Sequence, residues 1–174
     1  MEWIDILTDG YNRVPEYVGR ILDGLTYDDM KWMPSKDSNP IGWSIWHGIR
    51  GMDAQIASLA GTEQLYIKDG WARKFNRPAD AGDTGFGDGP AEVAAFEPPD
   101  GSVLLGYTEA SVKRAIEYMN TLTSKDLDRE LGGHWTPPPT VGVRLVSIME
   151  DAVIHAAEAA YARGLRQGMG WQPY

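Results

Sequence analysis

Two residues of the chain have the types and the spacing of ligands for a divalent metal ion. Asp151 and His155 lie four residues apart in a segment that the apolar pattern predicts to be a helix, from about Val141 to Gln167. A helix advances about 100° per residue, so the two side chains project from one face, about 40° apart. Zinc, nickel, iron and manganese accept imidazole and carboxylate ligands together. The pair therefore supplies half of a candidate metal site.

Two further carboxylates lie beside this pair. Glu158 follows His155 by three residues and shares its face of the helix. Three roles are open for Glu158: a further metal ligand, a hydrogen-bond partner of an imidazole N–H, or a general base. Glu150 is displaced by about 100° from Asp151 and is therefore the weaker candidate for a ligand.

The missing ligand can come from His47, which lies in the aromatic segment 43–47 (Trp-Ser-Ile-Trp-His). The pattern predicts a helix from about Ile41 to Leu59, with Asn39 as the N-cap and Pro40 at the first helical position. Asp53, on the same predicted helix, lies about 120° away from His47 and is less well aimed. His47 could thus close the site from a second helix.

Spacing alone also allows simpler interpretations. An isolated Asp-x-x-x-His pair is often only a surface pair worth a few tenths of a kcal/mol. A histidine in a Trp-rich helix such as His47 is more often a hydrogen-bonded core residue. His134 lies in a Gly/Pro-rich stretch, where we expect a loop without a chemical role. Arg144 and Arg163 are expected to pair with the many acidic residues.

The rest of the pattern predicts an all-α protein, a four-helix bundle with long crossover connections. Besides 41–59 and 141–167, helices are predicted over 3–22, where the internal Pro15 should kink or restart the helix, and over about 101–122. Bundle cores often house metal sites built from facing helices. We expect a single domain spanning residues 1–174.

The connections are predicted in less detail. Residues 64–75 are weakly helical, 91–96 and 123–127 form short turns, and 76–90 form a long loop. Such a loop is either a lid that contacts substrate or a solvated insert. Asp100, Ser124 and Thr140 are the expected caps of the elements that follow them.

Composition narrows the function classes. The chain has 16 basic and 25 acidic residues and a net charge of −9, which disfavours binding to nucleic acid. It contains no cysteine, so thiolate ligands and cysteine nucleophiles are excluded. We expect no signal peptide, because the N-terminus has no basic region, and no membrane span. A cytoplasmic location is the resulting expectation.

Two segments together resemble the DinB-like (DinB/YfiT-type) superfamily. Residues 39–47 read Asn-Pro-Ile-Gly-Trp-Ser-Ile-Trp-His, similar to the second-helix motif of that family. The Asp151–His155 pair, followed by residues 160–168 (Ala-Tyr-Ala-Arg-Gly-Leu-Arg-Gln-Gly), resembles the last-helix motif. The resemblance implies a four-helix bundle, often dimeric, with a divalent ion bound by His47, Asp151 and His155. The loop between the second and third long helices is longer than usual for the family.

The resemblance also implies a reaction class. Relatives include mycothiol-dependent maleylpyruvate isomerase and mycothiol or bacillithiol S-transferases, so a thiol such as mycothiol is the expected cosubstrate of a small-molecule substrate. Glu158 or Tyr161 would assist proton transfer. Asp151 is one methylene shorter than the glutamate of the isomerase, which requires closer helices or a shifted ion. A metal-dependent hydrolase, and a non-enzymatic bundle with a vestigial site that binds a small molecule or a partner, are the alternatives.

Overall fold

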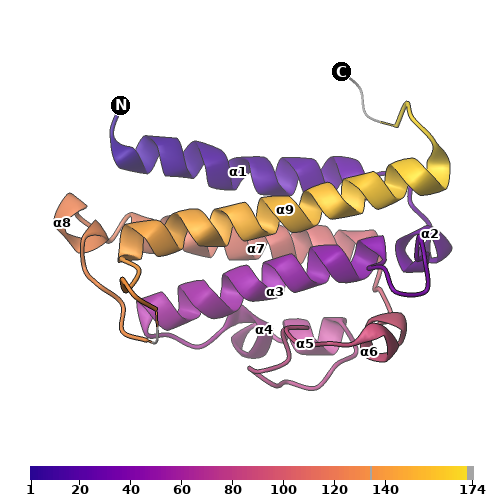
Figure 1. The fold of residues 1–174 in the computed structure, drawn as a ribbon, viewed down its shortest axis with the longest axis horizontal. Helices are drawn as coiled ribbons and strands as arrows, with labels where there is room; N and C mark the ends of the chain where they lie inside the picture. The colour runs from indigo at the N-terminus through magenta and orange to yellow at the C-terminus, as the bar shows by residue number, and fades with distance from the viewer. Residues whose placement is uncertain (134, 172–174) are drawn as a thin grey trace.

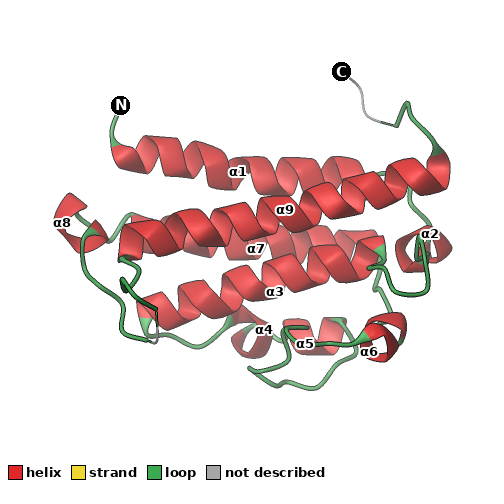
Figure 2. Cartoon of the chain, in the orientation of Figure 1, coloured by secondary structure: helices red, strands yellow, loops and turns green. Residues whose placement is uncertain are grey.

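Where the structure describes the chain, four long helices form a bundle. The computed structural model describes residues 1–133 and 135–171, and the ordered elements there are helical (Figures 1 and 2). The long helices are α1 (Trp3–Leu22), α3 (Ile41–Ala60), α7 (Gly101–Met119) and α9 (Val141–Gln167). Helices α1 and α3 each pack on both α7 and α9, so α1 and α3 occupy opposite corners, and the most extensive contact joins α3 to α9. The all-α four-helix prediction is confirmed.

In the described part of the chain, five short helices fill the connections. They are α2 (Tyr27–Lys31), α4 (Leu65–Lys68), α5 (Trp71–Lys74), α6 (Pro90–Ala94) and α8 (Ser124–Leu127). In the view of Figure 1, α4, α5 and α6 lie below α3, on the side opposite to α1. The long connection between α3 and α7 therefore forms a layer against one side of the bundle.

Several predicted helix boundaries are confirmed. The Asp100 side chain accepts a hydrogen bond from the amide of Ser102 at 2.8 Å and begins α7, while Thr140 accepts one from Val143 at 3.3 Å and begins α9. Such bonds satisfy amide groups that the first turn of a helix leaves without a partner.

Other predicted details are wrong. Pro40, with an extended backbone (φ −75°, ψ 157°), is itself the N-cap of α3, so neither Asn39 as the cap nor Pro40 as a helical residue is correct. The cap of α8 is Thr123, whose hydroxyl bonds the Asp126 carboxylate at 2.6 Å, and not Ser124. Helix α1 continues through Pro15 as one element, because its buried face on both sides of the proline packs into the same core.

Helix α2 was not predicted. Thr26 and Asp29 form a reciprocal capping box that begins it, and Met30 is its buried residue. Asp29 also accepts a hydrogen bond from Arg166 of α9 at 3.1 Å. This small helix therefore ties the α1–α3 connection to the end of α9.

The prediction about His134 concerns a position outside the described residues.

The Asp29 contacts predict a pH dependence of stability. Hydrogen bonds from Thr26 first, and from Arg166 second, hold the pKa of the Asp29 carboxyl below its ordinary value. A pKa lowered by folding stabilises the protein above the unfolded value, about 3.9, and this contribution is lost as the pH falls through the folded pKa. Asp29→Asn should therefore make the free energy of unfolding less sensitive to acid, as measured by urea unfolding at successive pH values below about 5. Asp28→Asn, at the exposed preceding residue, is the control, and equal acid sensitivity in both variants would contradict the prediction.

None of the helices in the part of the chain that the structure describes is both long enough and apolar enough to cross a membrane.

Candidate metal centre

The two histidines meet at a close contact between α3 and α9. Gly48 of α3 faces His155 of α9, and a Cβ atom at Gly48 would lie only 2.9 Å from the Cβ of His155. This lack of a side chain lets the adjacent His47 ring come beside the His155 ring, with centroids 4.7 Å apart and planes at 77°. The packing of α3 on α9, with no side chain at Gly48, thus brings together residues about a hundred positions apart in the sequence.

His155 is oriented by the carboxylate that follows it. Its Nδ1 atom lies 2.9 Å from Oε2 of Glu158, and because an ionised carboxylate only accepts, Nδ1 is the donor. The other nitrogen, Nε2, lies 3.7 Å from Oδ1 of Asp151. Metal-binding histidines commonly donate their second N–H to a carboxylate or a carbonyl. Of the three roles open to Glu158, the hydrogen-bond partner of an imidazole is the one this geometry matches.

His47 is oriented in the same way by a backbone carbonyl. Its Nδ1 atom lies 2.6 Å from the carbonyl oxygen of Thr84, which can only accept, so Nδ1 carries the proton. The ring stacks on Trp43, with centroids 4.6 Å apart and planes at 15°. In both histidines the Nδ1 atom is thus occupied by a hydrogen bond, and Nε2 is the nitrogen left with a ligand role.

Asp151 reaches from α9 toward α3. Its Oδ2 atom would lie 3.2 Å from a Cβ placed on Gly51, so a glycine again makes the room. The side chains of Asp151 and Glu158 are 46% and 47% exposed, whereas that of His155 is only 15% exposed. The carboxylates therefore stand at the solvent side of the histidine pair, where a small molecule has access to them.

The imidazole and carboxylate groups of His47, Asp151 and His155 are suitable ligand types for a divalent ion, but they do not lie close enough together to bind one ion. At bond lengths of about 2.0–2.2 Å, two ligand atoms at a tetrahedral angle are roughly 3.4 Å apart, slightly less than the 3.7 Å between His155 and Asp151. Among residues 1–133 and 135–171, no three His, Asp or Glu side chains are close enough together to hold an ion. Binding of one ion by His47, Asp151 and His155 would therefore require these side chains to move closer together.

Tyr161 lies one turn beyond Glu158 on α9 and is 72% exposed. Both residues border a shallow surface depression that also includes Asn39 and Leu165. The roles of Tyr161 and Glu158 in proton transfer stay predictions.

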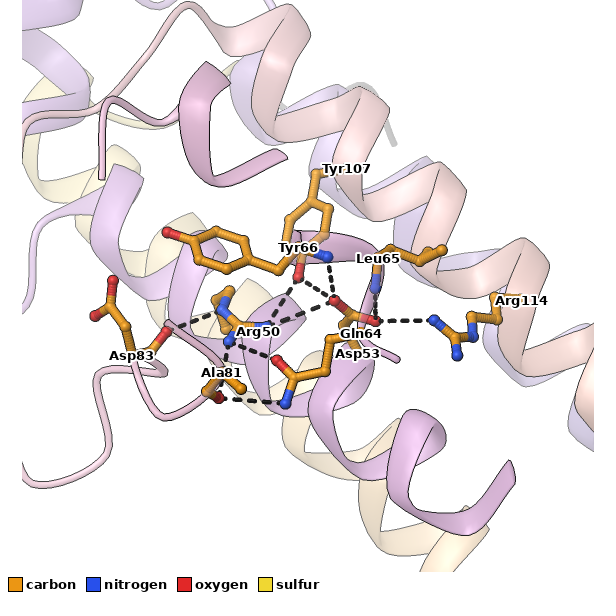
Figure 3. A network of polar contacts seen from close by, with 9 residues as sticks. All are labelled: Arg50, Asp53, Gln64, Leu65, Tyr66, Ala81, Asp83, Tyr107 and Arg114. Carbon is orange, nitrogen blue, oxygen red and sulfur yellow. Dashed lines mark hydrogen bonds and ion pairs between the residues drawn. The ribbon is translucent and has the colours of Figure 1, made fainter. Parts of the chain in front are cut away.

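Figure 3 shows a buried polar network around Arg50, which lies one turn beyond His47 on α3. Its central residues are Arg50 and Asp53 of α3, whose side chains are fully buried and 3.5 Å apart. Asp53 accepts hydrogen bonds from the amides of Leu65 and Tyr66 at 2.9 and 2.8 Å, and from the Tyr107 hydroxyl at 2.8 Å. Burial first, and the Asp53 charge second, raise the pKa of the Tyr107 hydroxyl well above its ordinary value. Asp53 thus anchors α4 to α3 and α7.

Arg50 connects the same network to the loop that precedes α6. Its Nε donates to the carbonyl of Asp83 at 2.9 Å, one guanidinium nitrogen bonds the Gln64 side chain at 2.8 Å, and the group stacks 3.9 Å from the centre of the Tyr66 ring. Sequence reasoning missed this network, although two charged residues among the apolar residues of one helix are the pattern that could have indicated it.

Within residues 1–133 and 135–171, Arg144 and Arg163 do not form the ion pairs that we expected. Arg144 donates to the side-chain oxygen of Gln55 at 3.0 Å. Arg163 donates to the backbone carbonyls of Arg20 and Ile21 at 2.8 and 2.7 Å, close to the end of α1, and its burial lowers the pKa of the guanidinium. Both arginines therefore connect helices of the bundle through neutral acceptors.

Comparisons with known proteins agree with this architecture. A crystal structure of a conserved protein from Enterococcus faecalis is similar to the chain, with a TM-score of 0.87 and 29% sequence identity over 95% of this chain and 97% of that one. No functionally curated protein matches the sequence. The family model of the DinB superfamily matches residues 11–159, a range that includes His47, Asp151 and His155. The chain therefore belongs to the DinB superfamily.

Proposed function

We propose that the chain is a divalent-metal-dependent enzyme that uses a low-molecular-weight thiol, such as mycothiol, for S-transfer to a small molecule or for isomerisation. His47, Asp151 and His155 would hold the ion, which is Zn, Ni, Fe or Mn in this proposal. The observation that carries the proposal is the pair of imidazole rings of His47 and His155, whose centroids are 4.7 Å apart. In each ring a hydrogen bond occupies Nδ1, so Nε2 is the candidate ligand atom.

The surroundings of the histidines support chemistry at this position. A bound divalent ion lowers the pKa of a thiol or a water, so that a nucleophile forms near neutral pH. Glu158 would hold the His155 ring through Nδ1 and receive a proton at its exposed carboxylate, while Tyr161 would contact the substrate from the solvent side. Trp43 covers one face of the His47 ring and excludes water there.

The test is zinc binding by protein stripped with a chelator, measured by titration calorimetry and elemental analysis. Removing a hydrogen-bond partner of a metal ligand typically lowers metal affinity by about 10–100-fold. Ala variants of His47, Asp151 and His155 should each lower zinc affinity by more than this. Glu158→Ala should fall within that range, because Glu158 supports His155 and is not itself a ligand. Glu150→Ala, at the exposed neighbour of Asp151, should bind zinc as the unaltered chain does.

The results also separate the alternatives. Stoichiometric zinc in the His47→Ala and His155→Ala variants would refute the proposed site, and a larger loss in Glu158→Ala than in Asp151→Ala would exchange the roles of the two carboxylates. A vestigial site predicts no effect of zinc on the thermal unfolding of the unaltered chain, since only a ligand of the folded state raises its stability. Turnover of test substrates without any added thiol would favour the hydrolase.

A further inference from the structure

The loop formed by residues 81–88, here called the 81–88 loop, lies against the stripe of α3 that carries His47. That stripe consists of Trp43, Trp46, His47 and Arg50, which recur at the i, i+3, i+4 and i+7 positions of one helix face. The loop bonds three of these four side chains: the carbonyl of Thr84 accepts from His47, the carbonyl of Asp83 accepts from Arg50, and the carboxylate of Asp88 accepts from the Trp43 indole at 3.3 Å.

Two arginines fix the part of the loop that comes just before Thr84. Arg77 forms a two-bonded ion pair with the Asp83 carboxylate, at 2.6 and 2.8 Å, and its guanidinium lies 4.7 Å from the centre of the Trp46 ring. The paired Asp83 carboxylate raises the pKa of Arg77. The buried Arg50 of α3 donates hydrogen bonds to the carbonyls of Ala81 and Asp83. The segment just before Thr84 is therefore held in two ways: Arg77 binds the Asp83 side chain, and Arg50 binds the Ala81 and Asp83 carbonyls.

Gly85 permits the close approach of this backbone to the histidine. Its φ is +82°, a conformation that favours glycine, and its position is buried. A Cβ atom there would lie 2.9 Å from Nδ1 of His47, 2.9 Å from the Trp46 ring and 3.0 Å from the Trp43 ring. Any side chain at this position would push the loop, and with it the Thr84 carbonyl, away from the Nδ1 proton.

We propose that the 81–88 loop is a positioning element for His47 and not a lid over the substrate. The Thr84 carbonyl fixes the Nδ1–H form of the ring and thereby presents Nε2 to the ion, and Arg77, Asp83 and Gly85 are positioning residues that act through this carbonyl. The inference rests on the proposed metal site. A lid would have to leave α3 during turnover, which would break the bonds to Trp43, His47 and Arg50 together.

The test compares Gly85→Ala with Gly87→Ala in the full chain. Gly87 has nearly the same backbone strain, with φ +89°, but a Cβ there meets no atom within 4 Å, so it is a matched control. Gly85→Ala should raise the zinc dissociation constant by about 10–100-fold, as expected for a partner behind a ligand. Gly87→Ala should leave the constant close to that of the unaltered chain. A competing chromophoric chelator measures both.

A second measurement is independent of metal binding. Long-range proton–nitrogen NMR spectra of the metal-free protein should show the His47 ring as the single Nδ1–H form in the unaltered chain and in Gly87→Ala. Gly85→Ala should show a mixture of the two neutral forms. If Gly85→Ala does not fold, Asp83→Asn replaces it, and its zinc dissociation constant should rise by about tenfold.

The outcomes distinguish this inference from the proposed function. Equal zinc dissociation constants in folded Gly85→Ala and Gly87→Ala, with the Nδ1–H form retained in both, would overturn the positioning role. An unchanged dissociation constant in Asp83→Asn would overturn it in the substitute experiment. Absence of zinc binding by the unaltered chain would instead refute the metal site itself, and that result needs no variant.

Discussion

Replacing Asp53 by alanine is expected to destabilise the fold by about 3–5 kcal/mol, because it breaks a buried ion pair by removing one partner. The Arg50 guanidinium is fully buried beside it and would lose the carboxylate that lies 3.5 Å away. The amides of Leu65 and Tyr66 would also lose their acceptor inside the protein. A buried donor without a partner costs about 1–3 kcal/mol, so these losses add to the uncompensated charge.

Chemical unfolding of Asp53→Ala and of Asp9→Ala tests this expectation. Asp9 is paired with Arg13 at 2.8 Å, but both side chains are more than half exposed, so the same substitution at a surface pair should cost about 1 kcal/mol or less. Hydrogen exchange should accelerate at the amides of Leu65 and Tyr66 in Asp53→Ala only. A similar loss of stability in the two variants would show that the network does not hold α4 against α3.

Replacing Gly48 by alanine is expected to destabilise the protein by about 1–3 kcal/mol, since it overpacks the contact between α3 and α9. The added Cβ would meet the Cβ of His155 at 2.9 Å, and this atom cannot move without the α9 backbone. The two helices must then separate, which draws the His155 ring away from His47. Zinc affinity should therefore fall along with stability.

Gly19→Ala is the matched control for this second experiment. Gly19 also lies inside a long helix, α1, but a Cβ there meets only the Leu105 side chain, at an ordinary contact distance of 3.8 Å. Alanine is favoured over glycine in a helix interior by about 0.8–1.0 kcal/mol, so Gly19→Ala should stabilise the protein. Urea unfolding should therefore show that glycine-to-alanine substitution lowers the free energy of unfolding at position 48 and raises it at position 19. A stabilising Gly48→Ala would contradict the close approach of α3 and α9.

The helices were predictable because their pattern is local. The apolar period located α1, α3, α7 and α9, and Asp100 and Thr140 begin their helices as short polar side chains do. Helix α2 was missed because its five residues are too few for a period, so that only its capping box marked it. Helix α1 does not restart at Pro15, because burial on both sides of a proline can outweigh one lost hydrogen bond.

The candidate site was predictable only in part. Spacing identified Asp151 and His155, the predicted four-helix layout offered His47 as the third ligand, and the resemblance pointed to the same three residues. The distance between the two helices depends on Gly48, which no spacing rule indicates. The Thr84 carbonyl could not be foreseen, because any backbone can supply an acceptor and only the course of the loop decides which one does. The homodimer, the thiol and the cytoplasmic location stay predictions.

The separation of the site residues along the chain has a consequence for folding. His47 and His155 are about a hundred residues apart, whereas Arg50, Asp53 and Tyr66 lie within one short stretch. Closing a loop of that length costs conformational entropy, so we expect the contacts between α3 and α9 to form after the local contacts. The contacts among Arg50, Asp53 and Tyr66 can form locally, while the bond to Tyr107 and the histidine pair join helices that are far apart in the sequence. An ion held between α3 and α9 would therefore bind the completed fold and not its precursors.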